Sequence, residues 1–189
     1  MPVVFVGSSV EQKDLALDIC TWLEEVGCEP KIWTEIFDLG DQQMLKLVEV
    51  AKEVDAAVFI FGADDELWYR GDRITSPRDN VVLEFGLFSG VFGGFQERRS
   101  VIVRVKDSKI PTDLQGFTYD AYSAQKRKTA ESNLRKWAKA LKPRASTPPI
   151  IKLFAKQKKD LFIQGTEIIT NAQTRVKLFA KTPVPIVGP

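Results

Sequence analysis

One glutamate lies within an apolar stretch of this chain and is the residue best placed to do chemistry. Residues 76–90 read Ser-Pro-Arg-Asp-Asn-Val-Val-Leu-Glu-Phe-Gly-Leu-Phe-Ser-Gly, with Glu84 among the apolar side chains. Ser76 and Pro77 predict the start of a helix, with the serine as N-cap and the proline at the first helical position. The residues that follow predict a helix that is buried on all sides, in which Gly86 and Gly90 allow close packing. A buried carboxylate must be paired, protonated or open to a pocket, so Glu84 is either a structural ion-pair partner or a functional group.

The composition limits the chemistry that the chain can perform. Its 189 residues include no histidine, which excludes Ser-His-Asp catalysis, Cys-His catalysis and His-ligated metal sites. The two cysteines, Cys20 and Cys28, have a spacing typical of neither zinc sites nor redox motifs, and they suit reduced thiols. We therefore expect no metal site and no resident cofactor.

The sequence shows neither a membrane segment nor a secretion signal. No run of apolar residues is long enough to form a transmembrane helix, and the first residues lack a basic region. These observations predict a cytoplasmic protein that does not contact a membrane.

Charge is divided unevenly along the chain. Residues 1–97 contain 7 Lys/Arg and 19 Asp/Glu, whereas residues 98–189 contain 20 and 6. This asymmetry favours either self-association of an acidic and a basic face or nucleic-acid binding, unless the basic half is simply solvated. Nucleic acid is the less favoured partner, because the basic half lacks interleaved aromatic residues for base stacking.

Strand and helix patterns alternate along residues 3–142. The expected strands are residues 3–7, 29–33, 56–62, 100–105 and, more weakly, 119–122. Four helices are expected. The first begins with a Ser9–Gln12 capping box and ends at Gly27. The others are a helix over residues 41–53, the central helix that contains Glu84, and a basic helix at about 124–142. Residues 62–75 are expected to form a polar loop. This order predicts an α/β fold with an open parallel sheet and helices on both faces.

Ligands of such sheets bind beyond the carboxyl ends of the strands. The residues expected at that edge include Gly7-Ser8-Ser9, Trp33 and Asp64. The Gly7-Ser8-Ser9 segment offers amides and hydroxyls for a phosphate at a helix N-terminus, although taken alone it favours an ordinary N-cap. It matches neither the Walker A loop nor the dinucleotide Gly-x-Gly-x-x-Gly motif.

Several other side chains near this edge suit nucleotide binding. Arg78, Asp79 and Asn80 could hydrogen-bond to ribose or phosphate, or could cap the central helix. Trp33 and Trp68 could stack on a base, or could belong to the core or its rim.

The C-terminal part of the chain differs from the rest. Residues 143–149 are rich in Pro, Ser, Thr and basic residues and predict a linker after a domain of residues 1–142. Residues 150–189 contain the segment Lys-Leu-Phe-Ala-Lys twice and are too short for an independent core. We expect them to be a short C-terminal extension or the start of a truncated second domain.

The motifs in residues 3–142 resemble, in order, the prokaryotic TIR-like nucleotide-binding domains of anti-phage defence systems. The matching segments are Phe5-Val6-Gly7-Ser8-Ser9, Trp33-Thr34, Asp64-Asp65, Arg70-Gly71, Ser76-Pro77-Arg78-Asp79-Asn80-Val81-x-x-Glu84-x-Gly86-Leu87-Phe88-x-Gly90 and Ile110-Pro111-x-Asp113-Leu114-x-Gly116. The chain departs from the family at Phe92-Gly93-Gly94, where Leu-Gly-Arg is more usual.

The resemblance implies a flavodoxin-like fold that cleaves the nicotinamide–ribose bond of NAD⁺, with Glu84 as the catalytic glutamate. It also implies a defence effector. The opposed acidic and basic halves of the chain lead us to expect that this effector is activated by assembly into oligomers or filaments. Such domains are often fused to sensor domains for cyclic nucleotides, including STING-like domains. NAD⁺ would be the substrate rather than a cofactor.

This chemistry agrees with the residues themselves. Nicotinamide leaves as a neutral molecule, so the reaction needs no metal and no general acid, only a carboxylate near the anomeric carbon. Two alternatives remain open at this point. One is a non-catalytic nucleotide-sensing or scaffolding module, and the other is a nucleoside deoxyribosyltransferase-like enzyme with a glutamate nucleophile at the same edge.

Overall fold

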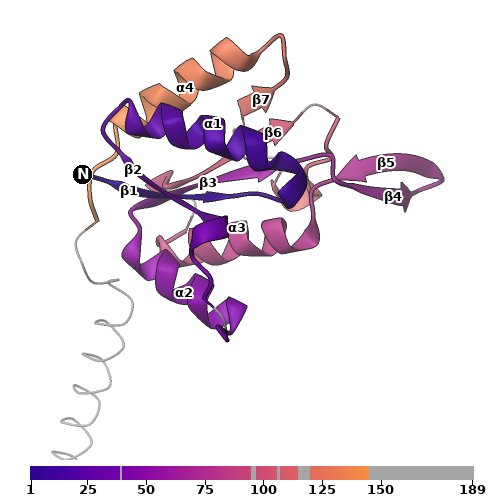
Figure 1. Cartoon of the computed structure of the whole chain (residues 1–189). Helices are drawn as coiled ribbons and strands as arrows, with labels where there is room; N and C mark the ends of the chain where they lie inside the picture. Colours follow the sequence, from indigo (N-terminus) through magenta and orange to yellow (C-terminus); the bar gives the residue numbers. More distant parts are fainter. Residues whose placement is uncertain (39, 95–96, 106, 115–119, 145–189) are drawn as a thin grey trace, which may run out of the picture. The chain divides into compact units, whose positions relative to one another are not determined.

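The computed structural model describes residues 1–38, 40–94, 97–105, 107–114 and 120–144, and they form an α/β domain around a parallel sheet (Figure 1). The sheet contains β1 (Val3–Gly7), β2 (Glu29–Ile32), β3 (Ala56–Phe61), β6 (Ser100–Val105) and β7 (Asp120–Tyr122). The strand order is β2-β1-β3-β6-β7, and every pair is parallel. This is the flavodoxin-like order, so the predicted fold class is confirmed.

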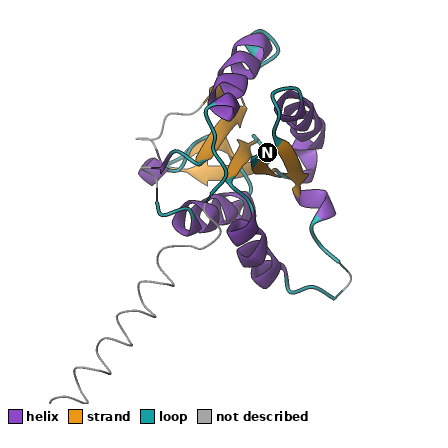
Figure 2. Ribbon diagram, turned by 90° about the vertical axis from the view of Figure 1, so that its left-hand side faces the viewer, coloured by secondary structure: helices purple, strands orange, loops and turns teal. Residues whose placement is uncertain are grey.

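Two helices cover each face of the sheet (Figures 1 and 2). α1 (Lys13–Glu24) and α4 (Arg127–Lys139) pack on one face, with the side chains of Val4 and Val6 beneath them. α2 (Gln43–Glu53) and α3 (Asp79–Val91) pack on the other face, against Phe5 and its neighbours. Adjacent residues of β1 therefore serve opposite layers, as the period of two in a strand requires. All six residues of β3 are buried, because this strand lies in the middle of the sheet and is covered on both faces.

Aromatic rings fix α3 on the sheet. The ring of Phe88 stacks on Phe5 at a centroid distance of 4.5 Å and meets Phe59 edge-on at 5.4 Å. Phe85 packs edge-on against Phe59 and Phe61 at 5.7 and 5.8 Å. Such offset and edge-to-face pairs add to the burial of apolar area, so the position of α3 is well determined.

The predicted polar loop at residues 62–75 is wrong, because this segment is a β-hairpin. β4 (Asp65–Tyr69) pairs antiparallel with β5 (Asp72–Ser76), and the hairpin projects beyond the sheet in Figure 1. Its two central turn residues, Arg70 and Gly71, have φ values of 54° and 91°. Positive φ at both positions is typical of the tight hairpin turn whose twist matches that of the strands.

The hairpin also shifts the start of the central helix. Ser76 ends β5 and its hydroxyl donates to the carbonyl of Pro77 at 3.3 Å, so it does not cap α3, which begins at Asp79. The Ser9–Gln12 capping box is likewise wrong. Ser9 precedes a short 3-10 turn, η1 (Val10–Gln12), and makes no capping bond.

The remaining elements lie close to their predicted ranges. α2 and α4 fall within the expected helices, and β7 overlaps the weak fifth strand, of which residue 119 lies outside the described residues. Two further 3-10 turns are η2 (Trp33–Glu35) and η4 (Thr112–Leu114).

Asp55 joins the two ends of the described chain at the amino edge of the sheet. One carboxylate oxygen accepts the backbone N–H of Val3 at 2.8 Å, and the other accepts the backbone N–H of Arg144. The Arg144 guanidinium lies over the ring of Phe92 at 4.8 Å. The predicted linker at 143–149 therefore begins with anchored residues. Its remainder, and the predicted extension at 150–189, lie outside the described residues.

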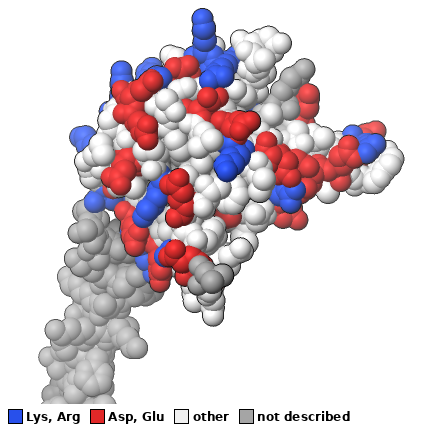
Figure 3. Space-filling model, in the orientation of Figure 1, with Lys and Arg blue, Asp and Glu red and all other residues white. Residues whose placement is uncertain are grey.

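Basic side chains are concentrated on one helix, α4. In Figure 3 basic side chains gather over α4, whereas acidic ones dominate the rest of the visible face and the base of the hairpin. No helix in the described ranges is long and apolar enough to cross a membrane. Within the same ranges, no group of three or more cysteine and acidic side chains is arranged to hold a metal ion.

Candidate functional site

The loop after β1 is held rigidly at the carboxyl edge of the sheet. The indole N–H of Trp33 donates to the Ser8 hydroxyl at 2.9 Å, and that hydroxyl donates to the carbonyl of Ser9 at 2.9 Å. Gly7 lies so close to the core that a Cβ there would stand 2.7 Å from two ring carbons of Phe59. The predicted Gly7-Ser8-Ser9 segment and Trp33 are therefore brought together.

Asp64 joins this loop from the end of β3. Its Oδ1 accepts a hydrogen bond from the Gln12 side chain at 2.7 Å, and its backbone N–H donates to the carbonyl of Ser76 at 3.0 Å. The carboxylate lies over Gly62, where a Cβ would come within 2.2 Å of Oδ1. The other carboxylate oxygen and the hydroxyl of Ser9 are buried and find no hydrogen-bond partner among the described residues. These two oxygens are available to hydrogen-bond a ligand.

Arg78 completes the cluster at the entrance to α3. Its guanidinium forms an ion pair with Glu11 and lies 4.0 Å from the Asp65 carboxylate. Hydrogen bonds from the Glu11 backbone and from Arg78 lower the pKa of Glu11. The predicted site residues Asp79 and Asn80 are exposed on the first turn of α3, and no side-chain hydrogen bond or ion pair within the described part of the chain joins them to this cluster.

Glu84 lies in the second turn of α3, next to the buried Phe85. Its side chain is half-buried and makes no hydrogen bond or ion pair with any described residue. Burial raises the pKa of its carboxyl from 4.5 to about 7. Among the described residues there is therefore no structural ion pair to explain this carboxylate.

The helix around Glu84 is not buried on all sides, contrary to the prediction. Leu83 is 56% exposed, and a Cβ at Gly86 or Gly90 would have no neighbour within 4 Å. The reason is that α3 lies flat on the sheet, so only the stripe with Val81, Phe85 and Phe88 is covered. Glu84 lies between the covered and the exposed sides.

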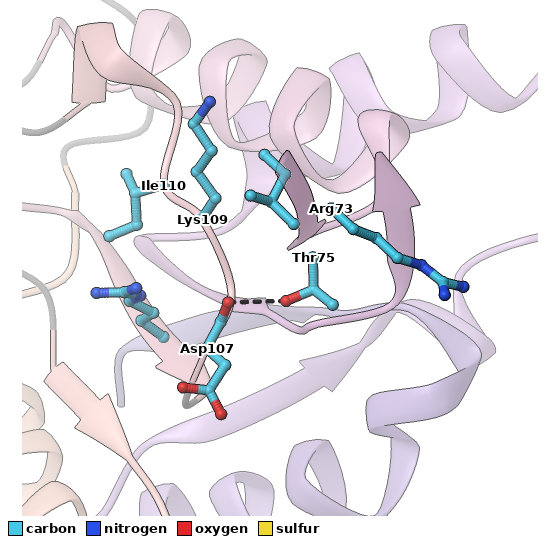
Figure 4. Close-up of a pocket in the computed structure, with 7 residues that line it drawn as sticks. Arg73, Thr75, Asp107, Lys109 and Ile110 are labelled. Carbon is cyan, nitrogen blue, oxygen red and sulfur yellow. Dashed lines mark hydrogen bonds between the residues drawn. The ribbon is translucent and has the colours of Figure 1, made fainter. Parts of the chain in front are cut away.

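The hairpin places two features that the sequence analysis missed. Trp68 is 80% exposed on β4, so it belongs neither to the core nor to its rim, which were the alternatives to base stacking. A cavity of about 730 Å³ lies between β5 and the residues that follow β6 (Figure 4). The available signal for the hairpin was the Arg70-Gly71 pair between two short segments that contain strand-forming residues, Trp-Tyr before it and Ile-Thr after it.

The sheet is parallel, has five strands and follows the flavodoxin-like order, and α3 carries a half-buried glutamate. These features agree with the class of TIR-like domains expected from the motifs. The family model for the "CAP12/Pycsar effector protein, TIR domain" matches residues 3–124. The chain belongs to this family, and the predicted resemblance to TIR-like domains of anti-phage defence is confirmed.

Individual relatives agree with the family match. The CD-NTase-associated protein 12 of Sphingobacterium faecium is 37% identical over 116 residues, which cover 61% of this chain and 34% of that protein. The Pycsar effector protein XpPycTIR of Xanthomonas perforans is 36% identical over 135 residues, covering 68% of this chain and 42% of that protein. The matched region thus spans less than half of either relative.

Proposed function

We propose that this domain is an NAD⁺ glycohydrolase in which Glu84 acts on the nicotinamide–ribose bond. The observation that carries the proposal is the half-buried Glu84 carboxylate, which has no partner among the described residues and a pKa raised to about 7. Carboxylates in such environments occur preferentially at functional sites. The membership of the chain in a family of TIR effector domains supports the same conclusion.

The proposed reaction needs one negative charge near the anomeric carbon. The nicotinamide ring of NAD⁺ is cationic, so its binding favours the ionised form of Glu84 and lowers the pKa of this carboxyl. The carboxylate then stabilises the oxocarbenium-like centre, or forms a transient ester with it, while nicotinamide leaves as a neutral molecule. A water molecule completes the hydrolysis.

The residues around the β1 loop would bind the rest of the substrate. The amides at the start of η1 and the side chain of Arg78 suit the phosphates. The buried oxygens of Ser9 and Asp64 suit hydroxyl groups of the sugar. The Trp33 ring, held by Ser8, offers a surface for stacking. Asp79 and Asn80 are proposed to bind the substrate as well, and the only support for this is their position at the start of α3.

We further propose that assembly of several copies activates the domain in the full-length protein. Its relatives are named as CD-NTase-associated and Pycsar effector proteins, and most of their length lies outside the matched region. A fused sensor for a cyclic nucleotide would gather copies of this domain into oligomers or filaments. The separated acidic and basic surfaces support contacts between copies, and light scattering in rising salt tests whether those contacts are electrostatic.

Nicotinamide release from NAD⁺ tests the reaction. It is measured by chromatography at high protein concentration and with a crowding agent. The variants are Glu84→Gln and, as a matched control, Glu24→Gln on the exposed surface of α1. We expect release by the wild type and by Glu24→Gln, and none by Glu84→Gln.

The other outcomes contradict the proposal in different ways. Equal release by Glu84→Gln would remove this residue from the reaction. NAD⁺ binding with no release in any assembly state would favour a non-catalytic module, and base exchange between deoxynucleosides would favour a deoxyribosyltransferase-like enzyme.

A further inference from the structure

The hairpin of β4 and β5 has one edge that no described strand covers. On the β5 side, Thr75 forms a parallel bridge with Ser108, and its carbonyl accepts the backbone N–H of Lys109 at 2.8 Å. On the β4 side, no backbone hydrogen bond within the described ranges joins β4 to any strand other than β5. In the part of the chain that the structure describes, β4 is therefore an open edge strand, and such edges readily accept a further strand.

The pairing within the hairpin decides which backbone groups point outward. Tyr69 pairs with Asp72 across the two-residue turn. In such a hairpin the pair next to the turn exchanges both backbone hydrogen bonds, and the residues along the strand then alternate. Leu67 therefore directs its N–H and C=O groups toward β5, whereas those of Glu66 and Trp68 point away from β5.

The open edge carries exposed apolar side chains. Trp68 is 80% exposed and Leu67 is 45% exposed. They lie on opposite faces of the hairpin, because successive side chains of a strand alternate. The charge of Glu66 is directed within its own hairpin, since its carboxylate forms an ion pair with Arg73 of β5. Apolar side chains beside outward-pointing backbone groups are typical of an edge to which another strand is added.

A second copy of β4 fits this edge in one register. Two strands related by a twofold axis run antiparallel, and each residue lies opposite one from the same face of the sheet. With Leu67 opposite Leu67 of the second copy, Glu66 lies opposite Trp68, and the outward N–H and C=O groups of both residues are satisfied. A register that sets Glu66 opposite Glu66 brings like charges together, which destabilises the pair. A register centred on Trp68 sets Glu66 opposite Arg70, which is in the turn with a φ of 54°.

We propose that two copies of this domain associate through β4 in the register centred on Leu67. Their hairpins then form one antiparallel sheet of four strands, with the two β4 strands side by side in the middle. A hairpin of two strands is at best marginally stable in water, whereas three or more strands with an apolar face are stable. The association therefore stabilises an element that projects beyond the central sheet (Figure 1). This inference rests on the proposed assembly of copies and names a surface that joins them.

Sedimentation equilibrium of the full chain over a range of concentrations tests the association. Trp68→Pro removes an outward N–H, and proline is tolerated at edge positions whose N–H faces away from the sheet. Leu67→Lys places two ammonium groups opposite each other at the twofold axis. We expect each variant to weaken the association of wild-type chains by at least about tenfold. Leu17→Lys is the matched control, because Leu17 is 48% exposed on α1, and it should leave the association unchanged.

Cysteine cross-linking tests the register. Residues opposite each other in a non-hydrogen-bonded pair have Cβ atoms about 4.5–5.5 Å apart, which suits a disulfide. With oxidised glutathione, Leu67→Cys should form a linked dimer at least about tenfold faster than Trp68→Cys or Leu17→Cys. The native thiols do not compete, because burial raises the pKa of Cys20 to about 11 and Cys28 is buried.

A wild type that stays monomeric at every concentration would overturn the proposal, as would unchanged association in both Trp68→Pro and Leu67→Lys. Cross-linking of Leu17→Cys as fast as that of Leu67→Cys would also contradict it, and faster cross-linking of Trp68→Cys would refute the register. These failures leave NAD⁺ cleavage by Glu84 and assembly through the charged surfaces standing. Conversely, a lack of nicotinamide release would not alter the measured association, so the two proposals fail separately.

Discussion

Replacing Glu84 by glutamine should stabilise the fold while abolishing the proposed activity. The folded-state pKa of Glu84 is raised from 4.5 to about 7 by burial, with no compensating partner among the described residues. The unfolded chain therefore releases its proton at a lower pH than the folded chain. The protonated carboxyl of Glu84 therefore contributes favourably to the free energy of unfolding. This contribution is complete below pH 4.5 and is lost as the pH rises through about 7.

The size of the effect follows from the two pKa values. One pKa unit corresponds to about 1.4 kcal/mol, so ionised Glu84 costs the folded state at most roughly 3 kcal/mol in alkaline solution. At about pH 5 the cost is under roughly 1 kcal/mol, because most of the folded protein is still protonated there. Glutamine has a similar shape and no charge, so it removes this dependence on pH.

Urea unfolding of the wild type and of Glu84→Gln at pH 5 and pH 8 measures the difference in free energy of unfolding. We expect the advantage of the glutamine variant to grow by roughly 2 kcal/mol between these two pH values. All other titrating groups are common to both proteins and cancel. A difference that does not change with pH would show that Glu84 has an ordinary pKa and would refute the argument from burial. A carbon-13 NMR titration of the Glu84 carboxyl provides an independent measurement.

Three further predictions concern activity and packing. In steady-state kinetics, kcat/KM for NAD⁺ should rise with pH through about 7 and then level off, because free enzyme with ionised Glu84 is the active form; a flat profile would contradict this assignment. Gly7→Ala should lower the free energy of unfolding by about 1–3 kcal/mol, since its Cβ would stand 2.7 Å from the Phe59 ring. Gly86→Ala, in open space on α3, should raise it by up to about 1 kcal/mol, and the same urea experiment distinguishes the two.

The central sheet could be predicted well because its strands are short apolar runs between strong turn signals. β3 and β6 are examples, and both match their predicted ranges to within a residue. The hairpin could not be predicted in the same way. Its strands read Asp-Glu-Leu-Trp-Tyr and Asp-Arg-Ile-Thr-Ser, which are too polar to indicate a buried strand, and their stability comes from pairing with each other.

The candidate site was only partly visible in the sequence. Glu84 could be singled out because a carboxylate among apolar residues is a local anomaly. The ion pair of Arg78 with Glu11 and the hydrogen bond of Gln12 with Asp64 join residues more than fifty positions apart. Such contacts depend on the tertiary fold, and no periodicity or motif encodes them.

The double hydrogen bond at Asp55 has a topological consequence. One oxygen of the Asp55 carboxylate accepts the backbone N–H of residue 3, and the other accepts the backbone N–H of residue 144. The first strand of the domain and the segment after its last helix therefore lie side by side. A polypeptide with adjacent ends tolerates circular permutation and insertion into loops of other proteins. A short peptide could therefore join residue 144 to residue 2, and new termini could be opened at the Arg70-Gly71 turn of the hairpin. Such a permutant would keep α3 and Glu84 in place, and a partner domain could then be attached at the hairpin instead of at residue 144.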